Sequence, residues 1–231
     1  RPCARCAPDF STLTETRHAM LTVEIVSDIV CPWCFIGTRR LAAAIAQVRR
    51  DQPDFTCQKR WRPFFLNPDT PPAGEPYLPF LEQKFGGRAA VEGIFERVRQ
   101  AGSACGVTFA FENIPLRINT LQAHRLLHWA QQRGDAETLV ERLFVGNFQR
   151  GENLGDTAVL KRIAEECGYP GADVAAYLAS DADRQHVIDL ERQVREMGIN
   201  MVPTFIVGRQ VIVGAEDPSI LADAMRKALA A

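Results

Sequence analysis

Short apolar runs lie near both ends of the chain, and a single helical pattern separates the first two of them. The run LTVEIV at 21–26 is short and rich in β-branched residues, which predicts a buried strand. Apolar residues then recur at helical spacing from Leu41 to Val48, so 32–50 is predicted to form one amphipathic helix. The alternating residues at 55–65 predict a second strand.

A long block of helical patterns follows. Four prolines and a glycine within 67–76 predict a connection and a domain boundary, and from about 77 to 197 almost every segment has helical periodicity. Residues that commonly begin or end helices punctuate this block. The segments with the clearest helical pattern are 88–102, 119–134, 135–150, 156–168 and 181–198.

The strand pattern then returns. TFIV at 204–207 and QVIV at 210–213 predict two strands joined by a tight turn, and a last helix is predicted from Asp217. The order of elements predicts an α/β fold that a large all-helical insertion splits in two. The expected parts are an extension (1–19), the first part of the α/β domain (20–68), the insertion (69–197) and the second part of the α/β domain (198–231).

Composition and charge exclude several classes of function. The chain has 231 residues, 46% of them hydrophobic and 24% charged, with a formal net charge of −1. This balance offers no electrostatic footprint for nucleic acid, and neither a run of basic residues nor a long apolar stretch indicates a membrane. We therefore expect neither a nucleic-acid partner nor a membrane partner.

The start of the chain and its cysteines bear on the compartment. The segment 1–19 contains no continuous apolar region of the kind found in secretory signals, and Met20 directly precedes the first strand. We therefore expect the natural domain to begin near Met20. The chain has seven cysteines, an odd number, and Cys57, Cys105 and Cys167 stand alone, which is typical of buried thiols. A reducing, cytoplasmic location is expected.

The motif Cys31-Pro32-Trp33-Cys34 lies where the first strand gives way to the first helix. With Cys31 at the helix N-cap and Pro32 as the first helical residue, free backbone N–H groups and the helix dipole favour a thiolate. Cys34 lies one turn on and seven residues before Leu41, so it faces the buried side of the helix. We expect Cys31 to be the exposed attacking thiol and Cys34 the sheltered resolving thiol of an exchange site, because a four-residue loop makes a poor structural disulfide.

Pro203 is a second candidate for the same site. It lies immediately before the strand at 204–207, where proline is poorly tolerated, so its bond to Val202 is a candidate for the cis isomer. A cis bond would leave the Val202 backbone free to pair with an extended substrate, with the proline ring near the sulfurs. A trans turn proline is the alternative.

These motifs resemble the DsbA family of thioredoxin-fold proteins. The stretches VSDIVCPWCFIGTRRL, FFLNPDTPPAGEPYLPFLEQKFGG and INTLQAHRLLHWA are most similar to the FrnE-like branch, and the similarity runs from about Met20 to the C-terminus. The resemblance implies a thioredoxin-like fold and a thiol–disulfide oxidoreductase of oxidase or isomerase type. In that family the first cysteine is the nucleophile, the second resolves the mixed disulfide and a cis-proline loop contacts the substrate.

These roles carry over to Cys31, Cys34 and the Val202–Pro203 loop, with Pro32 and Trp33 as further substrate contacts. Thiol or disulfide substrates, either proteins or small molecules, are the expected partners. We expect no cofactor other than the redox-active disulfide itself.

Two departures qualify the resemblance. Strongly oxidising DsbA members have His where this chain has Trp33, which cannot donate a charge-assisted hydrogen bond to a thiolate, so a milder oxidant is expected. Thioredoxin-fold proteins often place a buried acid six residues before the nucleophile, but Ile25 occupies that position here. Either Asp28 or a water molecule is the expected acceptor of the Cys34 proton.

Three alternatives stand beside disulfide exchange. Cys3 and Cys6 form a second CxxC pair that could complete a zinc site or act as an accessory redox pair, although its spacing from Cys31 is long for zinc. Glutathione-dependent isomerases and transferases of the kappa and hydroxychromene carboxylate isomerase types share the split architecture, but usually carry Ser first and lack the second cysteine. Glutathione remains a candidate thiol partner. An inert binding module would not need two thiols at a helix N-terminus.

His124 and His128 lie four residues apart on one predicted helix. Such a pair could ligate a metal, but without a neighbouring acidic motif it is more often structural, and no metal is expected. Asn67 follows the second strand and is a weaker candidate for lining the cleft.

Overall fold

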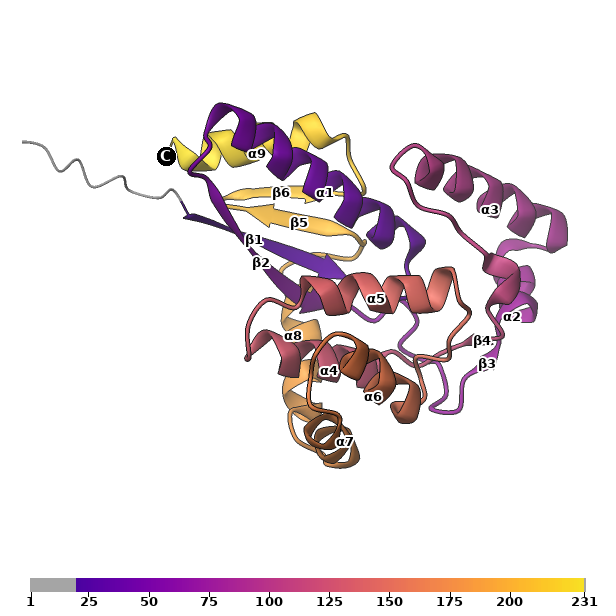
Figure 1. The fold of residues 1–231 in the computed structure, drawn as a ribbon. Coiled ribbons are helices and arrows are strands. Elements are labelled where there is room, and N and C mark those ends of the chain that lie inside the picture. Colours follow the sequence, from indigo (N-terminus) through magenta and orange to yellow (C-terminus); the bar gives the residue numbers. More distant parts are fainter. Residues whose placement is uncertain (1–19, 231) are drawn as a thin grey trace, which may run out of the picture.

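A four-stranded sheet of order β2-β1-β5-β6 lies at the centre of the computed structural model, which describes residues 20–230 (Figure 1). β1 (Met20–Ser27) pairs in parallel with β2 (Thr56–Pro63) and antiparallel with β5 (Thr204–Val207), which in turn pairs antiparallel with β6 (Gln210–Val213). The second half of β1 is buried almost completely, because it is a central strand covered on both faces. The strands that the apolar runs predict are therefore confirmed.

Helices cover both faces of this sheet. α1 (Pro32–Asp51) and α9 (Pro218–Leu229) pack against each other on one face, and α8 (Arg184–Glu196) lies on the other (Figure 1). A small separate core forms under α8 around Val26 and Val194. The sheet is thus the middle layer of a three-layer α/β arrangement.

The insertion between β2 and α8 is mostly helical. It contains α2 (Tyr77–Phe85), α3 (Arg88–Ser103), a 3-10 turn (Phe111–Asn113), α4 (Leu121–Gln131), α5 (Glu137–Phe148), α6 (Thr157–Glu166) and α7 (Gly171–Ala179). The prediction of an α/β fold split by a large helical insertion is confirmed. The extension at 1–19 lies outside the described residues, and the boundaries between the four expected parts stay predictions.

A two-stranded sheet makes the insertion less purely helical than expected. β3 (Glu75–Pro76) pairs antiparallel with β4 (Leu116–Arg117). Two residues are too few to show the period of a strand, so the sequence pattern could not reveal this pair. The buried Arg117 guanidinium holds it in place, since it forms ion pairs with Asp69 and Glu75 and stacks on the Phe80 ring.

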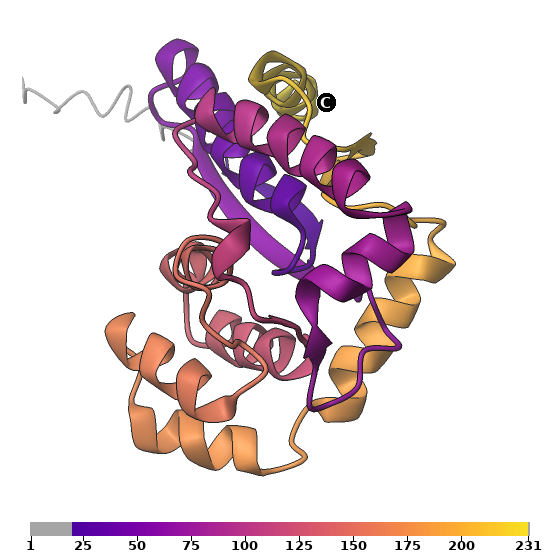
Figure 2. The same ribbon diagram turned by 90° about the vertical axis from the view of Figure 1, so that its right-hand side faces the viewer.

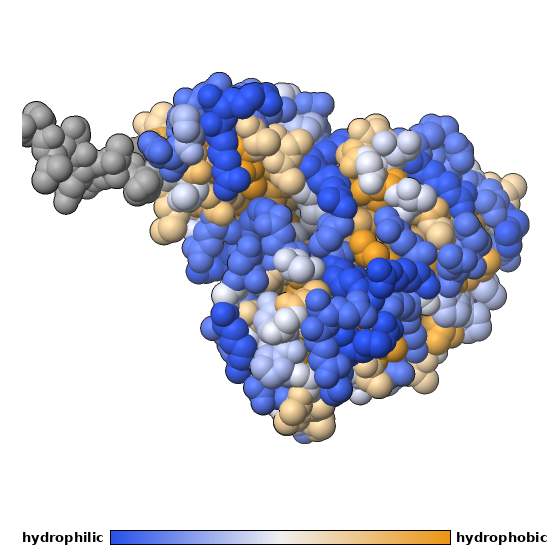
Figure 3. Space-filling view, in the orientation of Figure 1, coloured by the Kyte–Doolittle hydropathy of each residue, from blue (hydrophilic) through white to orange (hydrophobic). Residues whose placement is uncertain are grey.

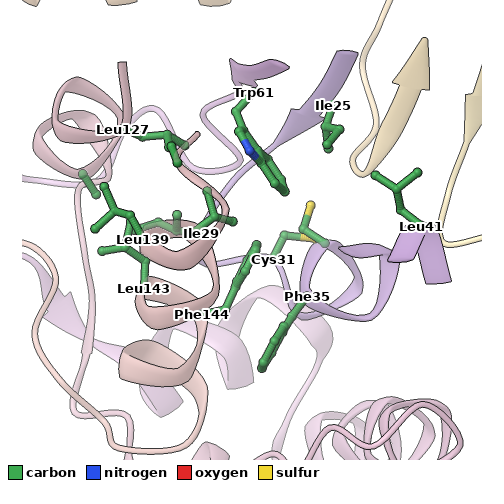
Figure 4. Close-up of a cluster of buried hydrophobic side chains, with 14 of the residues drawn as sticks. Ile25, Ile29, Cys31, Phe35, Leu41, Trp61, Leu127, Leu139, Leu143 and Phe144 are labelled. Atoms are coloured by element: carbon green, nitrogen blue, oxygen red, sulfur yellow. The ribbon is translucent and has the colours of Figure 1, made fainter. Parts of the chain in front are cut away.

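The α/β domain and the insertion share one hydrophobic core. Phe35 of α1 stacks on Phe144 of α5 with ring centroids 5.1 Å apart, and its edge meets Phe109 at 6.0 Å. Figure 4 shows this junction, with Cys31 beside the aromatic side chains that extend from both parts. In Figure 2, α3 lies alongside α1 on the outer side of the same core. The CPWC motif is therefore anchored in packing that both parts supply.

The face of the molecule in Figure 3 is largely hydrophilic, with hydrophobic residues in smaller patches between the helices. Small hydrophobic patches on a largely polar surface are ordinary in folded proteins. Among the described residues, no helix combines the length and apolar character needed to cross a bilayer.

Gly37 allows α1 to approach the segment that precedes β5. A Cβ atom at this position would lie 3.0 Å from Pro203 Cγ and 3.1 Å from Phe205 Cζ, in a fully packed region. We expect Gly37→Ala to destabilise the protein by about 1–3 kcal/mol, because overpacking forces neighbouring side chains to move. Urea unfolding followed by circular dichroism measures the change.

Gly93 in α3 provides the matched control, since a Cβ there would meet no atom within 4 Å. Gly93→Ala should stabilise the protein by about 0.5–1 kcal/mol through helix propensity alone. Equal effects of the two substitutions would contradict the close packing of α1 on Pro203.

Candidate active site

Cys31 caps the N-terminus of α1. Its backbone is extended, with φ −94° and ψ 111°, and Pro32 is the first helical residue. The Cys31 carbonyl accepts hydrogen bonds from the N–H groups of Cys34 and Phe35, at 3.0 and 3.4 Å. The predicted N-cap position is therefore confirmed, so Cys31 lies at the positive end of the α1 dipole.

Three loops meet at the end of the sheet where the two cysteines lie. Ser27 at the end of β1 pairs with Pro63 at the end of β2, and Val26 pairs with Thr204 at the start of β5. The loops that follow β1 and β2 and the loop that precedes β5 consequently lie at one edge of the sheet. Sites in α/β folds commonly form at such an edge, outside the carboxyl ends of parallel strands.

The loop before β5 covers Cys31. The Val202–Pro203 peptide bond is cis. Cys31 Sγ lies 3.7 Å from the Val202 carbonyl oxygen, within reach of a weak S–H···O hydrogen bond. The Pro203 carbonyl accepts a hydrogen bond from the Gly214 N–H at 2.7 Å, which ties this loop to the end of β6. The sequence-predicted residues Val202 and Pro203 are thus brought directly to the redox motif.

The expectation that Cys31 would be exposed is wrong for this conformation. Cys31 is 4% exposed and Cys34 1%, so both thiols are buried (Figure 4). The reason for the difference is tertiary: the Val202–Pro203 loop lies over a sulfur that the helix alone would leave open. The expectation of a sheltered Cys34 is confirmed.

Burial raises the pKa of the Cys34 thiol well above its ordinary value. The neighbouring Cys31 raises this pKa further, through a hydrogen bond and charge, while hydrogen bonds from the Ser27 side chain and the Asp28 backbone lower it. Burial is the larger effect, so Cys34 is held as a thiol until something removes its proton. Both cysteines are free thiols in this structure.

Large apolar side chains are exposed on the loops around the site. Trp33 is 39% exposed within the CPWC turn, Leu66 is 39% exposed on the loop after β2, and Met201 is 60% exposed just before Val202. Half-buried Asn67 lies next to Leu66, and its amide oxygen accepts a hydrogen bond from Lys84 at 3.3 Å. Trp33 thus lies in the first turn of α1, and Leu66 and Met201 lie on the loops after β2 and before β5.

A buried polar pair lies beneath the CPWC turn. The Asp28 carboxylate is fully buried, with Oδ1 3.1 Å from His124 Nε2 of α4 and Oδ2 accepting a hydrogen bond from the Leu66 N–H at 2.8 Å. His128, one turn along α4, is half-buried and its ring lies near that of His186. The two histidines therefore have separate surroundings, and His124 contacts Asp28, three residues before the CPWC motif.

The described residues hold no cluster of three or more His, Cys, Asp or Glu side chains that could ligate a metal ion. Cys3 and Cys6, the second pair of the zinc alternative, lie outside the described range. A groove of about 700 Å³ runs along the free edge of β2, where Trp61, His128 and Gln131 are among its lining residues. It includes neither cysteine of the CPWC motif.

Sequence reasoning missed several parts of this arrangement. Nothing local showed that the loops of Leu66 and Met201 lie at the same edge of the sheet as Cys31, because the sheet register alone brings these loops together. The contact between Asp28 and His124 spans 96 positions in the chain, so the two residues could be singled out but not paired.

Residues 22–226 match the DSBA-like thioredoxin domain family. The chain belongs to that family. Among the curated proteins, YwbO of Bacillus subtilis (strain 168), itself uncharacterized, is 29% identical over 207 residues, which is 88% of this chain and 94% of YwbO. The resemblance to the DsbA family that the sequence motifs indicate is thereby confirmed.

Solved structures of the DsbA family share the fold. The probable DsbA oxidoreductase SCO1869 from Streptomyces coelicolor has a TM-score of 0.82 and 28% identity, with 91% of this chain and 90% of that chain covered. The cytosolic disulfide reductase DsbM from Pseudomonas aeruginosa, solved with GSH, has a TM-score of 0.59 and 17% identity, with 91% and 96% covered. The thioredoxin-like fold expected from the sequence is confirmed, and the protein is a DsbA-family member of the thiol–disulfide oxidoreductase kind.

The raised pKa of Cys34 has a measurable consequence. In a Cys31→Ser variant, burial still disfavours the Cys34 thiolate, so its alkylation by iodoacetamide should be slow near neutral pH and should still be rising above the ordinary cysteine value of about 8.5. Peptide-resolved mass spectrometry separates Cys34 from the other thiols. A rate that levels off below about pH 8.5 would contradict the burial of this thiol.

Proposed function

We propose that this protein is a thiol–disulfide oxidoreductase of oxidase or isomerase type that works through Cys31 and Cys34. The observation that carries the proposal is the pair of free thiols on the first turn of α1, with Cys31 at the N-cap and the Val202 carbonyl against its sulfur. Two thiols one turn apart can close a small disulfide, and the helix terminus activates the first of them.

The reaction proceeds in two exchange steps. The Cys31 thiolate attacks one sulfur of a substrate disulfide, forms a mixed disulfide and releases the other substrate sulfur as a thiolate. Cys34 then loses its proton and attacks Cys31 Sγ, which forms the Cys31–Cys34 disulfide and releases the second substrate sulfur. The substrate gains two electrons and the protein loses two. In the opposite direction the oxidised protein takes two electrons from a substrate dithiol.

The substrate is a thiol or disulfide of a protein or a small molecule, held at the edge of the sheet. The exposed side chains of Trp33, Leu66 and Met201 are the proposed apolar contacts, together with Pro32 in the first turn of α1. The backbone of Val202 beside Pro203 offers hydrogen bonds to an extended segment of substrate, in place of its contact with Cys31 Sγ. Substrate entry then requires the loop over Cys31 to move aside.

Glutathione is the small thiol that we propose as a partner. DsbM, which shares the fold, was solved with GSH, and the chemistry of the CPWC pair suits exchange with any accessible thiol. Glutathione-dependent isomerases and transferases share this fold, so the fold alone does not distinguish them from disulfide oxidoreductases. Cys34 favours disulfide exchange, because a resolving thiol has no part in an isomerisation of bound substrate.

We place the protein in the cytoplasm. Cys57, Cys105 and Cys167 are free thiols in addition to the CPWC pair, as expected where the compartment keeps cysteines reduced. We also propose, from its sequence motifs, that the chain belongs to the FrnE-like branch of the DsbA family.

Substitution of each cysteine separates the two steps. Cys31→Ser should abolish reduction of a model disulfide, because no nucleophile remains, whereas Cys34→Ser should accumulate the mixed disulfide on Cys31. Intact-mass spectrometry detects the trapped species, and insulin reduction measures turnover. Cys105→Ser is the matched control, and its turnover and its content of mixed disulfide should equal those of the wild type. Full insulin-reducing activity in the Cys31→Ser variant would contradict this mechanism.

The reduction potential of the Cys31–Cys34 pair tests the direction of exchange. Titration in glutathione buffers, followed by alkylation mass shift, should give a value between about −120 and −230 mV, the range of oxidants and isomerases. A value near −270 mV would mark a reductase instead. Absence of any intramolecular disulfide would remove the exchange function altogether.

A further inference from the structure

The two outer strands of the central sheet are protected to different degrees. In the order β2-β1-β5-β6, β2 and β6 each have one edge without a neighbouring strand in the part of the chain that the structure describes (Figure 1). Such an edge presents unpaired N–H and C=O groups to any second strand, and proteins commonly protect it with charged or covering side chains. An edge without this protection is a typical site of strand pairing between chains.

The free edge of β2 is protected in both ways. The Gln131 side chain accepts a hydrogen bond from the Trp61 N–H at 2.7 Å and donates one to the Trp61 carbonyl at 3.1 Å, as a neighbouring strand would. Lys59, Arg60 and Arg62 add positive charge along the same strand. A second copy of β2 would bring like charges together, so this edge disfavours pairing between two copies of the chain.

The free edge of β6 has neither kind of protection. Its four residues, Gln210–Val213, carry no charge and include no proline. Val211 is 55% exposed and Val213 45%, and the two side chains lie on the same face of the sheet because they are two positions apart. This edge therefore combines unpaired backbone groups with exposed β-branched side chains, which is the combination that invites another strand.

The position of α8 explains why these valines are exposed. α8 packs chiefly on β2, at the other end of the sheet, and the small core beneath it includes Val26 and Val194. Ile206 of β5 is half-buried at the margin of that core. Val211 is the cross-strand partner of Ile206, so it lies on the same face but beyond the cover of α8, together with Val213.

The register of the β5–β6 ladder determines which backbone groups of β6 point outward. The Gly214 N–H donates to the Pro203 carbonyl at 2.7 Å, so these two residues form a hydrogen-bonded pair. Hydrogen-bonded and non-hydrogen-bonded pairs alternate along an antiparallel ladder. The backbone of Ile212 therefore bonds to β5, whereas the N–H and C=O groups of Val211 and Val213 point away from β5 toward the free edge.

A second copy of the same strand matches these outward groups. If two β6 strands run antiparallel about a twofold axis at Ile212, Val211 of one copy lies opposite Val213 of the other. Both residues of this pair point their N–H and C=O groups toward each other, so they exchange both hydrogen bonds, and the symmetry-related pair does the same. The sequence Val-Ile-Val is symmetric about its centre, as a contact between identical strands requires.

Charges at the two ends of β6 are also complementary between two such copies. Arg209, in the turn before β6, and Glu216, three residues after β6, are both exposed, and the ion pairs within residues 20–230 include neither of them. The antiparallel register brings the turn of one copy next to the segment that follows β6 in the other. Arg209 of each copy thereby comes near Glu216 of the other, which favours this orientation of the two chains more than it adds affinity.

We propose that the protein forms a homodimer in which β6 of one chain pairs with β6 of a second copy about a twofold axis at Ile212. The two four-stranded sheets then become one continuous sheet. Val213 lies at the end of β6 that adjoins the Pro203 loop and the CPWC motif, and antiparallel pairing places these ends on opposite sides. The two CPWC motifs therefore lie at opposite edges of the continuous sheet, and the dimer does not depend on the proposed disulfide exchange.

The mass of the full-length protein in solution tests the proposal. Sedimentation velocity is run from about 1 to about 100 µM, because a dimer of this kind responds to protein concentration, and a reductant prevents cross-linking through the free thiols. We expect the mass to approach twice the 25.7 kDa of one chain as the concentration rises. Hydrogen exchange of the Val211 and Val213 amides should slow over the same range. A monomer at every concentration, or a dimer whose β6 amides remain unprotected, would overturn the proposal.

Two double variants test the register. Val211→Lys combined with Val213→Lys places like charges opposite each other in the dimer, so we expect the dissociation constant to rise at least about tenfold. Val211→Lys combined with Val213→Glu removes the same valines but places opposite charges face to face, so its dissociation constant should stay much closer to that of the wild type. Equal dissociation constants for the two double variants would contradict pairing about Ile212.

Phe85→Lys is the matched control, since Phe85 is a similarly exposed apolar residue, at 43%, but lies on α2. It should leave the dissociation constant unchanged. Circular dichroism checks that each variant is folded. If the like-charge variant does not fold, Arg209→Glu takes its place: we expect it to weaken the dimer about three- to tenfold, and Glu216→Arg in the same chain to restore the affinity. An Arg209→Glu dimer as tight as the wild type, or a failure to restore, would then overturn the proposal.

Discussion

The buried carboxylate of Asp28 is the constraint on which the arrangement around the redox motif depends. A polar group without access to water must find its hydrogen-bond partners inside the protein. It finds them in the Leu66 N–H, on the loop after β2, and in His124, on a helix of the insertion. Because its backbone carbonyl also accepts a hydrogen bond from the Cys31 N–H, Asp28 links the CPWC turn to the neighbouring loop and to the insertion.

The site combines a reactive helix terminus with a cover. Cys31 lies at the N-cap of α1, at the positive end of the helix dipole, yet the loop at Val202 lies over the sulfur. Cys34 lies deeper, and burial keeps it protonated. This division of labour suits exchange chemistry, since the first thiol must meet a substrate and the second must wait until the mixed disulfide has formed.

The sequence was a good guide to features that depend on neighbouring residues. The CPWC turn, the N-cap and the strands before and after the insertion follow from local apolar runs, proline placement and helix punctuation, so they could be predicted. The exposure of Cys31 could not be predicted in this way, because the loop that covers it lies 171 positions away in the chain. The pairing of Asp28 with His124 was hidden for the same reason, although each residue stood out by itself. The β3–β4 pair was too short to leave a pattern.

The stack of Phe35 on Phe144 has a consequence for how the protein can evolve. These rings come from the two parts of the chain that look separable in sequence, yet they fill one close-packed interior. A change of volume on one side must be matched on the other, so the insertion cannot drift, be exchanged or be deleted as an independent cassette. Selection acts on the two parts as one cooperative unit, and α1 inherits the sequence constraints of a helix more than 80 residues away, at Glu137–Phe148.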